Sequence, residues 1–129
     1  MIKHVDHLDI VSKRVEETIE FYKKLGFEVA GTVDDGKVTV LKGGPEKSPI
    51  FIDLTDAGWH GLTGIDHVSF VVNDVDQMFE ELKDNVRLED KAVWFAEGSG
   101  RRGFKVLDPN GILLQFTVVK SGYKWDKKK

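Results

Sequence analysis

Hydrophobic and polar positions follow two different periods along this chain, and each change of period marks a predicted element. Apolar and polar side chains alternate over residues 4–11, as in a half-buried strand. A helical period then runs between Ser12, a candidate N-cap, and Gly26, a candidate C-terminal stop. Its apolar positions are Val15, Ile19 and Tyr22. The pattern therefore predicts a strand followed by a short amphipathic helix.

Three further strands complete the first half of the chain. Runs of apolar and β-branched residues predict them over residues 27–33, 37–42 and 50–55. The tripeptide Asp34-Asp35-Gly36 is typical of a tight turn between the first two of these runs. The first half is thus predicted to be strand, helix, strand, strand, strand.

The second half repeats this order. A strand is predicted over residues 65–72, and Asp74 with Gln77 three residues later has the spacing of a helix capping box. Further strands are expected over residues 88–96, 102–107 and 112–119. The predicted fold is α+β, with two tandem βαβββ modules and helices on one face of a mixed sheet. Its parts are module one at 4–56, a linker at 57–64, module two at 65–119 and a basic tail at 120–129.

The first strand of each half carries the same short motif. Residues 5–11 read V-D-H-L-D-I-V, and residues 65–71 read I-D-H-V-S-F-V, so six of seven positions match in type. The motif places His7 and His67 at equivalent positions sixty residues apart. This repetition indicates a duplicated unit that contributes one histidine from each copy.

Side-chain alternation separates an apolar from a polar face in the first and last strands of each half. Alternate residues of a strand point to opposite faces, and the predicted helices must cover the apolar one. If the sheet curls, the other faces line a central cavity. Its polar side chains are then His7, Asp9, Asp53, Thr55, His67, Ser69, Gln115 and Thr117.

These side chains suit a metal site. Imidazole, carboxylate and amide oxygen are ligands of borderline divalent metals, and two histidines with one carboxylate also match the ligands of non-haem iron. The alternative is that polar residues alternating along a strand face bulk water. The repeated histidine favours the metal interpretation for His7 and His67.

Three other residues are candidates for contact with a substrate. Arg102 follows the Glu97-Gly98-Ser99-Gly100 loop, where a cation suits a substrate carboxylate or phosphate. Trp94 and Phe95 lie in a predicted strand, so one of them should face the cavity. The competing interpretations are a solvated surface charge for Arg102 and core packing for the two aromatic residues.

Composition excludes several classes of function. The 129 residues include no cysteine, which rules out disulfides, thiolate metal sites and cysteine nucleophiles. The net charge of -3 favours neither nucleic acid nor an anionic membrane as a partner. No apolar run approaches the roughly 20 residues of a membrane span, and we expect a cytoplasmic protein.

Two further motifs, F-Y-x-x-L-G-F at residues 21–27 and D-P-x-G-x-x-x-Q at residues 108–115, complete a recognisable set with the two histidine motifs. Over roughly residues 4–119 the chain resembles the vicinal oxygen chelate superfamily. This superfamily includes glyoxalase I, bleomycin- and fosfomycin-resistance proteins, extradiol dioxygenases and methylmalonyl-CoA epimerase. The resemblance implies paired βαβββ modules that form a curled sheet around a divalent metal, and a homodimer.

The resemblance also implies a ligand set. His7 and His67 fall on the two histidine ligands, Gln115 on the usual glutamate, and Asp53 on a glutamate or glutamine of glyoxalase I-like members. Asp53 then serves as ligand or general base, because the neutral amide of Gln115 has no useful basicity. The metal is zinc, nickel, cobalt, manganese or iron. Substrate contacts are expected from Asp9, Ser69, Thr117, Trp94, Phe95 and Arg102.

Three functions follow as hypotheses. The first is a metal-dependent enzyme of lyase or isomerase type whose small-molecule substrate chelates the metal through adjacent oxygens. The second is a binding protein of the bleomycin-resistance type without catalysis. The third is an Fe(II) extradiol-type dioxygenase.

Overall fold

The computed structural model describes residues 2–60 and 62–119, so the predicted basic tail at 120–129 lies outside the described residues. The chain divides into two compact units. Residues 7–66 belong to the first, which we call the N-terminal unit. Residues 2–6 and 67–119 belong to the second, the C-terminal unit.

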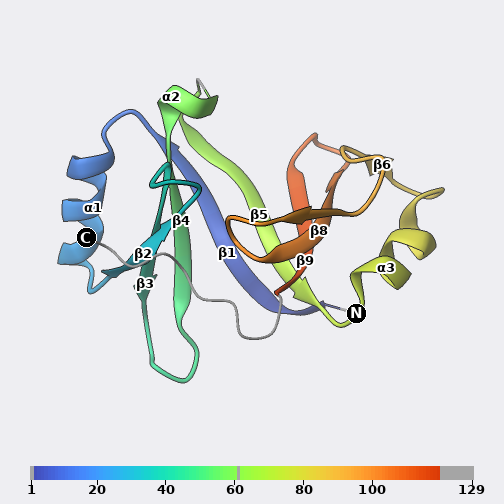
Figure 1. The fold of residues 1–129 in the computed structure, drawn as a ribbon, viewed down its shortest axis with the longest axis horizontal. Coiled ribbons are helices and arrows are strands. Elements are labelled where there is room, and N and C mark those ends of the chain that lie inside the picture. Colours follow the sequence, from blue (N-terminus) through green and yellow to red (C-terminus); the bar gives the residue numbers. More distant parts are fainter. Residues whose placement is uncertain (1, 61, 120–129) are drawn as a thin grey trace. The chain divides into compact units, whose positions relative to one another are not determined.

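The N-terminal unit contains most of β1 and the three strands that follow the first helix (Figure 1). Its hydrogen-bonded strand order is β2-β3-β4-β1, in which β1 is parallel to β4 and the other pairs are antiparallel. The bounds are β1 Ile2–Ser12, α1 Val15–Lys24, β2 Glu28–Val33, β3 Val38–Gly43, β4 Ile50–Asp56 and α2 Ala57–His60. The one-turn helix α2 lies where the sequence predicted only a linker.

Helix α1 covers one face of this sheet, as its apolar period predicted. Ile19 packs with Leu41, Ile52 and Leu54 in a buried cluster. The predicted N-cap of the helix is wrong by two residues, because Arg14 stands at that position. Ser12 does not cap it: the Ser12 hydroxyl accepts the backbone N–H of Arg14 at 2.9 Å, and the helix begins at Val15 without a side-chain cap.

The C-terminal unit contains the remaining strands and the second long helix (Figure 1). Its strand order is β5-β9-β8-β6, β7 pairs with β8, and β5 is parallel to β9. The bounds are β5 Gly64–Val72, α3 Val75–Leu82, β6 Arg87–Leu88, β7 Trp94–Ala96, β8 Arg101–Leu107 and β9 Leu113–Val119. The single strand predicted over residues 88–96 is therefore wrong, because two short strands flank a bend.

Helix α3 covers one face of this second sheet. Asp74 caps it as predicted, since its Oδ1 accepts the backbone N–H of Gln77 at 3.0 Å. Phe79 meets Phe104 edge to face, with 5.2 Å between ring centroids, over a core that includes Phe116. The predicted α+β fold, with a mixed sheet and helices packed on one face, is confirmed. None of the helices in the described part of the chain is long and apolar enough to cross a membrane.

Candidate metal and substrate site

The polar side chains on the faces opposite the helices are buried. Exposed fractions run from 0% for Ser69 and Thr117 to 8% for Asp9. The alternative that these alternating residues face bulk water is therefore wrong. The buried set comprises His7, Asp9, Asp53, Thr55, His67, Ser69, Gln115 and Thr117.

Four of these residues form one cluster in the N-terminal unit. In the parallel pairing of β1 with β4, Asp9 is the register partner of Asp53, so both carboxylates project from the same face. Thr55 donates its hydroxyl to Asp9 Oδ1 at 3.0 Å. His7 Nε2 lies 3.3 Å from Asp53 Oδ2. We call these four residues the N-terminal polar cluster.

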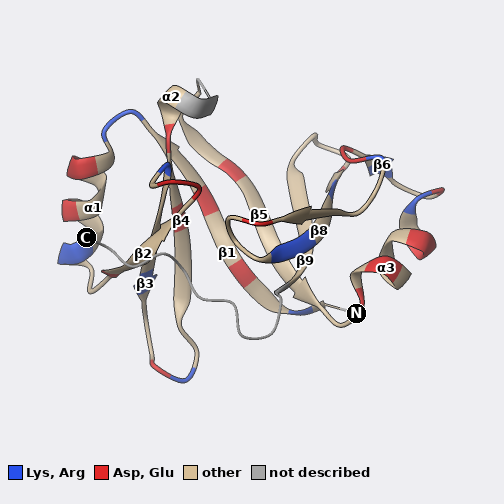
Figure 2. Cartoon of the chain, viewed as in Figure 1, with Lys and Arg blue, Asp and Glu red and all other residues tan. Residues whose placement is uncertain are grey.

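Valine side chains surround this cluster on the same face. Val40 is the register partner of Asp53, Val38 is the partner of Thr55, and Val11 lies beside Thr55 across the β1–β4 pair. All three are at most 5% exposed. Figure 2 shows acidic positions on β1 and β4 in red. The cluster thus combines two carboxylates with an apolar, poorly hydrated floor.

Burial has a clear electrostatic effect on Asp9. The pKa of this carboxyl is raised from its ordinary 3.8 to about 6, chiefly by loss of hydration and secondly by the neighbouring Asp53. The hydrogen bond from Thr55 and the proximity of His7 act in the opposite direction. Asp9 was expected only to contact substrate. Its environment also suits it to exchange a proton near neutral pH.

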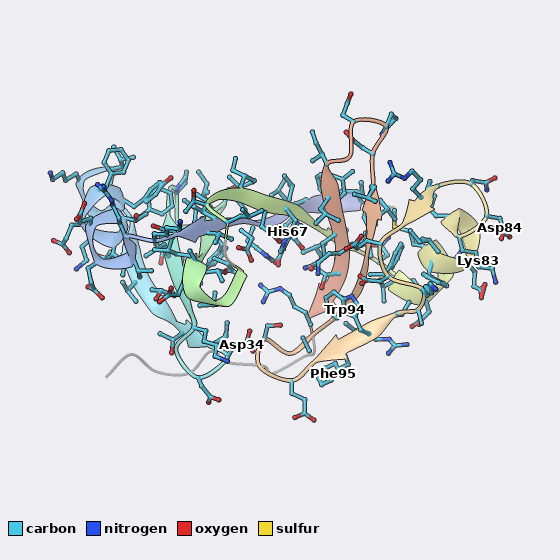
Figure 3. All side chains as sticks on the ribbon, turned by 90° about the horizontal axis from the view of Figure 1, so that it is seen from above. Asp34, His67, Lys83, Asp84, Trp94 and Phe95 are labelled. Carbon is cyan, nitrogen blue, oxygen red and sulfur yellow. The ribbon has the colours of Figure 1, made fainter. Side chains whose placement is uncertain are left out.

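The equivalent polar residues of the C-terminal unit also share one face. Gln115 is the register partner of Ser69 on β5 and of Lys105 on β8. Its Nε2 donates to Ser69 Oγ at 3.0 Å, so the carbonyl oxygen is the atom of this amide suited to bind a cation. Thr117 donates its hydroxyl to the backbone carbonyl of Arg102 at 3.2 Å. His67, labelled on β5 in Figure 3, is 7% exposed.

The two aromatic candidates on β7 separate, as alternation requires (Figure 3). Trp94 is the register partner of Gly103, which pairs in turn with Thr117, so Trp94 lies on the polar face. Its Nε1 donates to Asp90 Oδ2 at 2.7 Å. Phe95 lies on the opposite face and is 48% exposed.

Arg102 does not join the polar face. Its guanidinium donates to both carboxylate oxygens of Asp76 on α3, at 2.6 and 3.2 Å, and is largely exposed. The physical reason is its parity with Phe104 and Val106, which places it on the face that α3 covers. Arg102 thus lies on the helix-covered face, and its contact with a substrate stays a prediction.

The neighbouring residue Arg101, which the sequence also places beside the 97–100 loop, is the buried cation of this strand. It is 6% exposed, and its Nε donates to Asp6 Oδ2 at 2.7 Å. Alternation with Gly103 and Lys105 puts Arg101 on the face of Gln115 and Thr117. This parity was readable from the sequence, but nothing there showed which face of β8 the helix would cover.

Comparisons with known proteins agree with this fold. The family model described as the glyoxalase/bleomycin resistance protein/dioxygenase superfamily matches residues 4–116. A search of curated proteins finds no significant match.

Solved structures of the same fold are also found. Methylmalonyl-CoA epimerase of Streptomyces coelicolor, a variant bound to 2-nitronate-propionyl-CoA, is 22% identical with a TM-score of 0.74, covering 94% of this chain and 100% of its own. The epimerase of Mycobacterium tuberculosis is 20% identical with a TM-score of 0.73, over 92% and 89%.

A Mn(II)-bound glyoxalase from Novosphingobium aromaticivorans is 18% identical with a TM-score of 0.65, over 97% of this chain and 43% of its own. At these identities the likeness to solved structures concerns the fold alone. The family match spans nearly the whole described chain. The chain therefore belongs to the glyoxalase/bleomycin resistance protein/dioxygenase superfamily.

Proposed function

We propose that this protein is a divalent-metal-dependent enzyme of lyase or isomerase type. Its substrate is a small molecule that offers the metal two adjacent oxygens. The observation that carries the proposal is the buried pair of His7 and Asp53 in the N-terminal polar cluster. A buried imidazole and a buried carboxylate are donors that a borderline divalent metal prefers.

The pair also fits a metal in its spacing. Two ligand atoms that each lie about 2.1 Å from one metal are roughly 3.0–3.4 Å apart at octahedral or tetrahedral angles. His7 Nε2 and Asp53 Oδ2 are 3.3 Å apart. Zinc, nickel, cobalt, manganese and iron all accept this donor pair.

The repeated motif and the family resemblance add His67 and Gln115 to the proposed ligand set. His67 repeats the position of His7 in the duplicated motif, and Gln115 carries an amide oxygen on the same face as Ser69. The full set is then two imidazoles, one carboxylate and one amide. Because Gln115 is neutral, it contributes less affinity than a carboxylate in that place.

Chain residues supply the proton chemistry. A bound metal provides Lewis-acid polarisation of the substrate oxygens. Gln115 cannot accept a proton at neutral pH. The side-by-side carboxylates of Asp9 and Asp53 can, and with Asp53 committed to the metal, Asp9 becomes the proton acceptor. The valines around both carboxylates exclude water from the proton transfer.

Two relatives in fold support the isomerase type. Both are methylmalonyl-CoA epimerases, and the one from Streptomyces coelicolor is in complex with 2-nitronate-propionyl-CoA. The Mn(II)-bound glyoxalase supports a metal.

Metal content tests the proposal directly. Protein purified without a polyhistidine tag should carry about one divalent metal per chain by ICP mass spectrometry after exposure to Mn, Co, Ni or Zn. The variants His7→Ala and His67→Ala should lose this metal. His4→Ala is the matched control, because His4 lies on the same strand and is exposed. Equal metal content in all four proteins, or none in the parent, contradicts the proposal.

One observation favours a second candidate, a small-molecule-binding protein without catalysis. Gln115 stands where a basic carboxylate serves glyoxalase I-like enzymes, and its amide is already bonded to Ser69. Under this alternative, a ligand raises the melting temperature of the protein by the same amount with and without excess chelator. Ligand stabilisation that disappears with chelator supports the metalloenzyme instead.

A further inference from the structure

Arg101 is a buried cation that the proposed metal chemistry does not use. Its side chain is 7% exposed although a guanidinium is among the groups most costly to remove from water. The ion pair with Asp6, at 2.7 Å between Nε and Oδ2, offsets part of that cost.

That ion pair leaves most of the guanidinium available. Arginine has five N–H groups in a rigid planar fork. Among the residues that the structure describes, only the Nε–H of Arg101 has a hydrogen-bond partner. Asp6 therefore holds the side chain by one edge, and the edge formed by Nη1 and Nη2 remains for another planar acceptor.

The surroundings of Arg101 belong to the candidate site. On β8, Arg101, Gly103 and Lys105 alternate on one face, and β9 places Thr117 and Gln115 opposite the last two. An acceptor bound at Arg101 thus shares its face with the amide proposed as a metal ligand.

A fixed aromatic wall lies on the same face. Asp90 Oδ2 accepts both Trp94 Nε1 at 2.7 Å and the backbone N–H of Lys105 at 2.8 Å, which ties the indole to β8. Lys105 Nζ lies 5.6 Å from the Trp94 ring centroid. A Cβ added at Gly103 meets Trp94 Cη2 at 3.2 Å, so the ring lies directly against the strand.

From this geometry we propose that Arg101 binds a carboxylate of the substrate while Trp94 packs against its apolar part. The substrate class is a small monocarboxylate that also carries adjacent oxygens and a flat apolar group. This inference rests on the proposed function, because the adjacent oxygens of the substrate are those that the proposed metal would bind. A planar carboxylate matches the Nη1–Nη2 edge with two parallel hydrogen bonds. Since Asp6 already neutralises one charge, a monoanion fits better than a phosphate dianion.

The test compares two probes that differ in one charge. Benzoylformate has a carboxylate, a neighbouring ketone oxygen and a phenyl ring, and its methyl ester keeps all but the charge. Calorimetric titration of the metal-loaded protein should show benzoylformate bound and the ester at least about tenfold weaker. Inorganic phosphate should compete less well than benzoate.

The variants Arg101→Lys and Arg102→Lys form a matched pair. Both keep the charge and lose the fork, but Arg102 lies on the helix-covered face and pairs with Asp76. Arg101→Lys should weaken benzoylformate by about tenfold or more, leave the ester unchanged and retain the metal. Arg102→Lys should change neither the binding of benzoylformate nor the binding of the ester. Asp6→Asn keeps an oxygen that accepts the Nε–H but removes the neutralising charge, so it should not weaken benzoylformate. The melting temperatures of this variant and of Arg101→Lys show whether each is folded.

Several outcomes overturn the inference. They are no benzoylformate binding by the parent, ester and acid bound equally, equal effects of the two lysine variants, or phosphate bound more tightly than benzoate. If Arg101→Lys is unfolded, the ester comparison in the metal-free parent decides, because acid and ester then do not differ in metal chelation. Failure of the proposed function has a different signature, because it appears as absent metal in the parent protein whichever probe binds.

Discussion

At the scale of single residues, burial of the Asp9 carboxyl lowers the stability of the fold at neutral pH. Its pKa is about 6 in the folded chain and 3.8 ordinarily, so the folded state holds the proton more tightly. The stability that protonated Asp9 contributes is fully present below pH 3.8 and is lost as pH rises through about 6. At neutral pH the ionised group therefore destabilises the metal-free fold.

Asp9→Asn should remove this destabilisation. In excess chelator at pH 7.5, we expect the variant to be more stable than the parent by up to roughly 3 kcal/mol, and near parity below pH 4. Urea unfolding across pH 4–8 measures the difference. Asp35→Asn, in the exposed β2–β3 turn, is the control and should show no such trend. A gain independent of pH contradicts the assignment.

Gln115 sets the strength of the proposed metal site. Gln115→Glu keeps the shape, adds a charged ligand, and lets the Ser69 hydroxyl donate to the new carboxylate. We expect metal affinity to rise by about tenfold or more, measured by competition with a chromophoric chelator. Gln77→Glu, exposed on α3, should leave the affinity unchanged. An unaltered affinity in Gln115→Glu removes this residue from the ligand set.

At the scale of elements, β8 is positioned by the absence of a side chain at Gly103. A Cβ there lies 2.5 Å from the Phe116 carbonyl oxygen, a backbone atom that cannot move without disturbing the β8–β9 pair. The same Cβ would lie 3.2 Å from Trp94 Cη2. The close approach of β7, β8 and β9 therefore requires glycine at this position.

Gly103→Ala should destabilise the protein by about 2 kcal/mol or more through overpacking, and should weaken benzoylformate as Trp94 shifts. Gly58→Ala, exposed in α2, is expected to be near neutral. Chemical unfolding and the same calorimetric titration give both readouts. Stability equal to that of the parent means that β8 and β9 separate more easily than described.

At the scale of the whole molecule, metal should couple the site to folding. A metal present at a hundred times its Kd stabilises a folded protein by about 2.7 kcal/mol when the unfolded chain does not bind it. We expect chelator to lower the melting temperature of the parent and added metal to restore it. His7→Ala should show no response and His4→Ala the full one. A metal response in His7→Ala places the ion elsewhere.

Homodimer assembly and a cytoplasmic location stay predictions from the resemblance and the composition. If the protein is a homodimer, light scattering coupled to size exclusion should give a mass of about twice 14.6 kDa. A monomer mass at micromolar concentration excludes a stable dimer.

The sequence by itself determined the α+β order, the repeated histidine strands and the eight polar positions that prove buried. It could do so because side chains alternate along strands, and a duplicated motif preserves that alternation. The local sequence did not predict the start of α1 correctly. The Ser12 hydroxyl accepts the backbone N–H of Arg14 and does not cap the helix.

Only the tertiary structure decided which arginine is buried and which aromatic residue joins the site. Arg101 and Arg102 are neighbours with identical chemistry, and Trp94 and Phe95 are both aromatic residues of one strand. Their roles depend on which face of β8 receives α3, and that is set by the packing of Phe79 on Phe104, a contact between distant segments. Periodicity specifies that two faces differ, but long-range packing decides which one becomes the core.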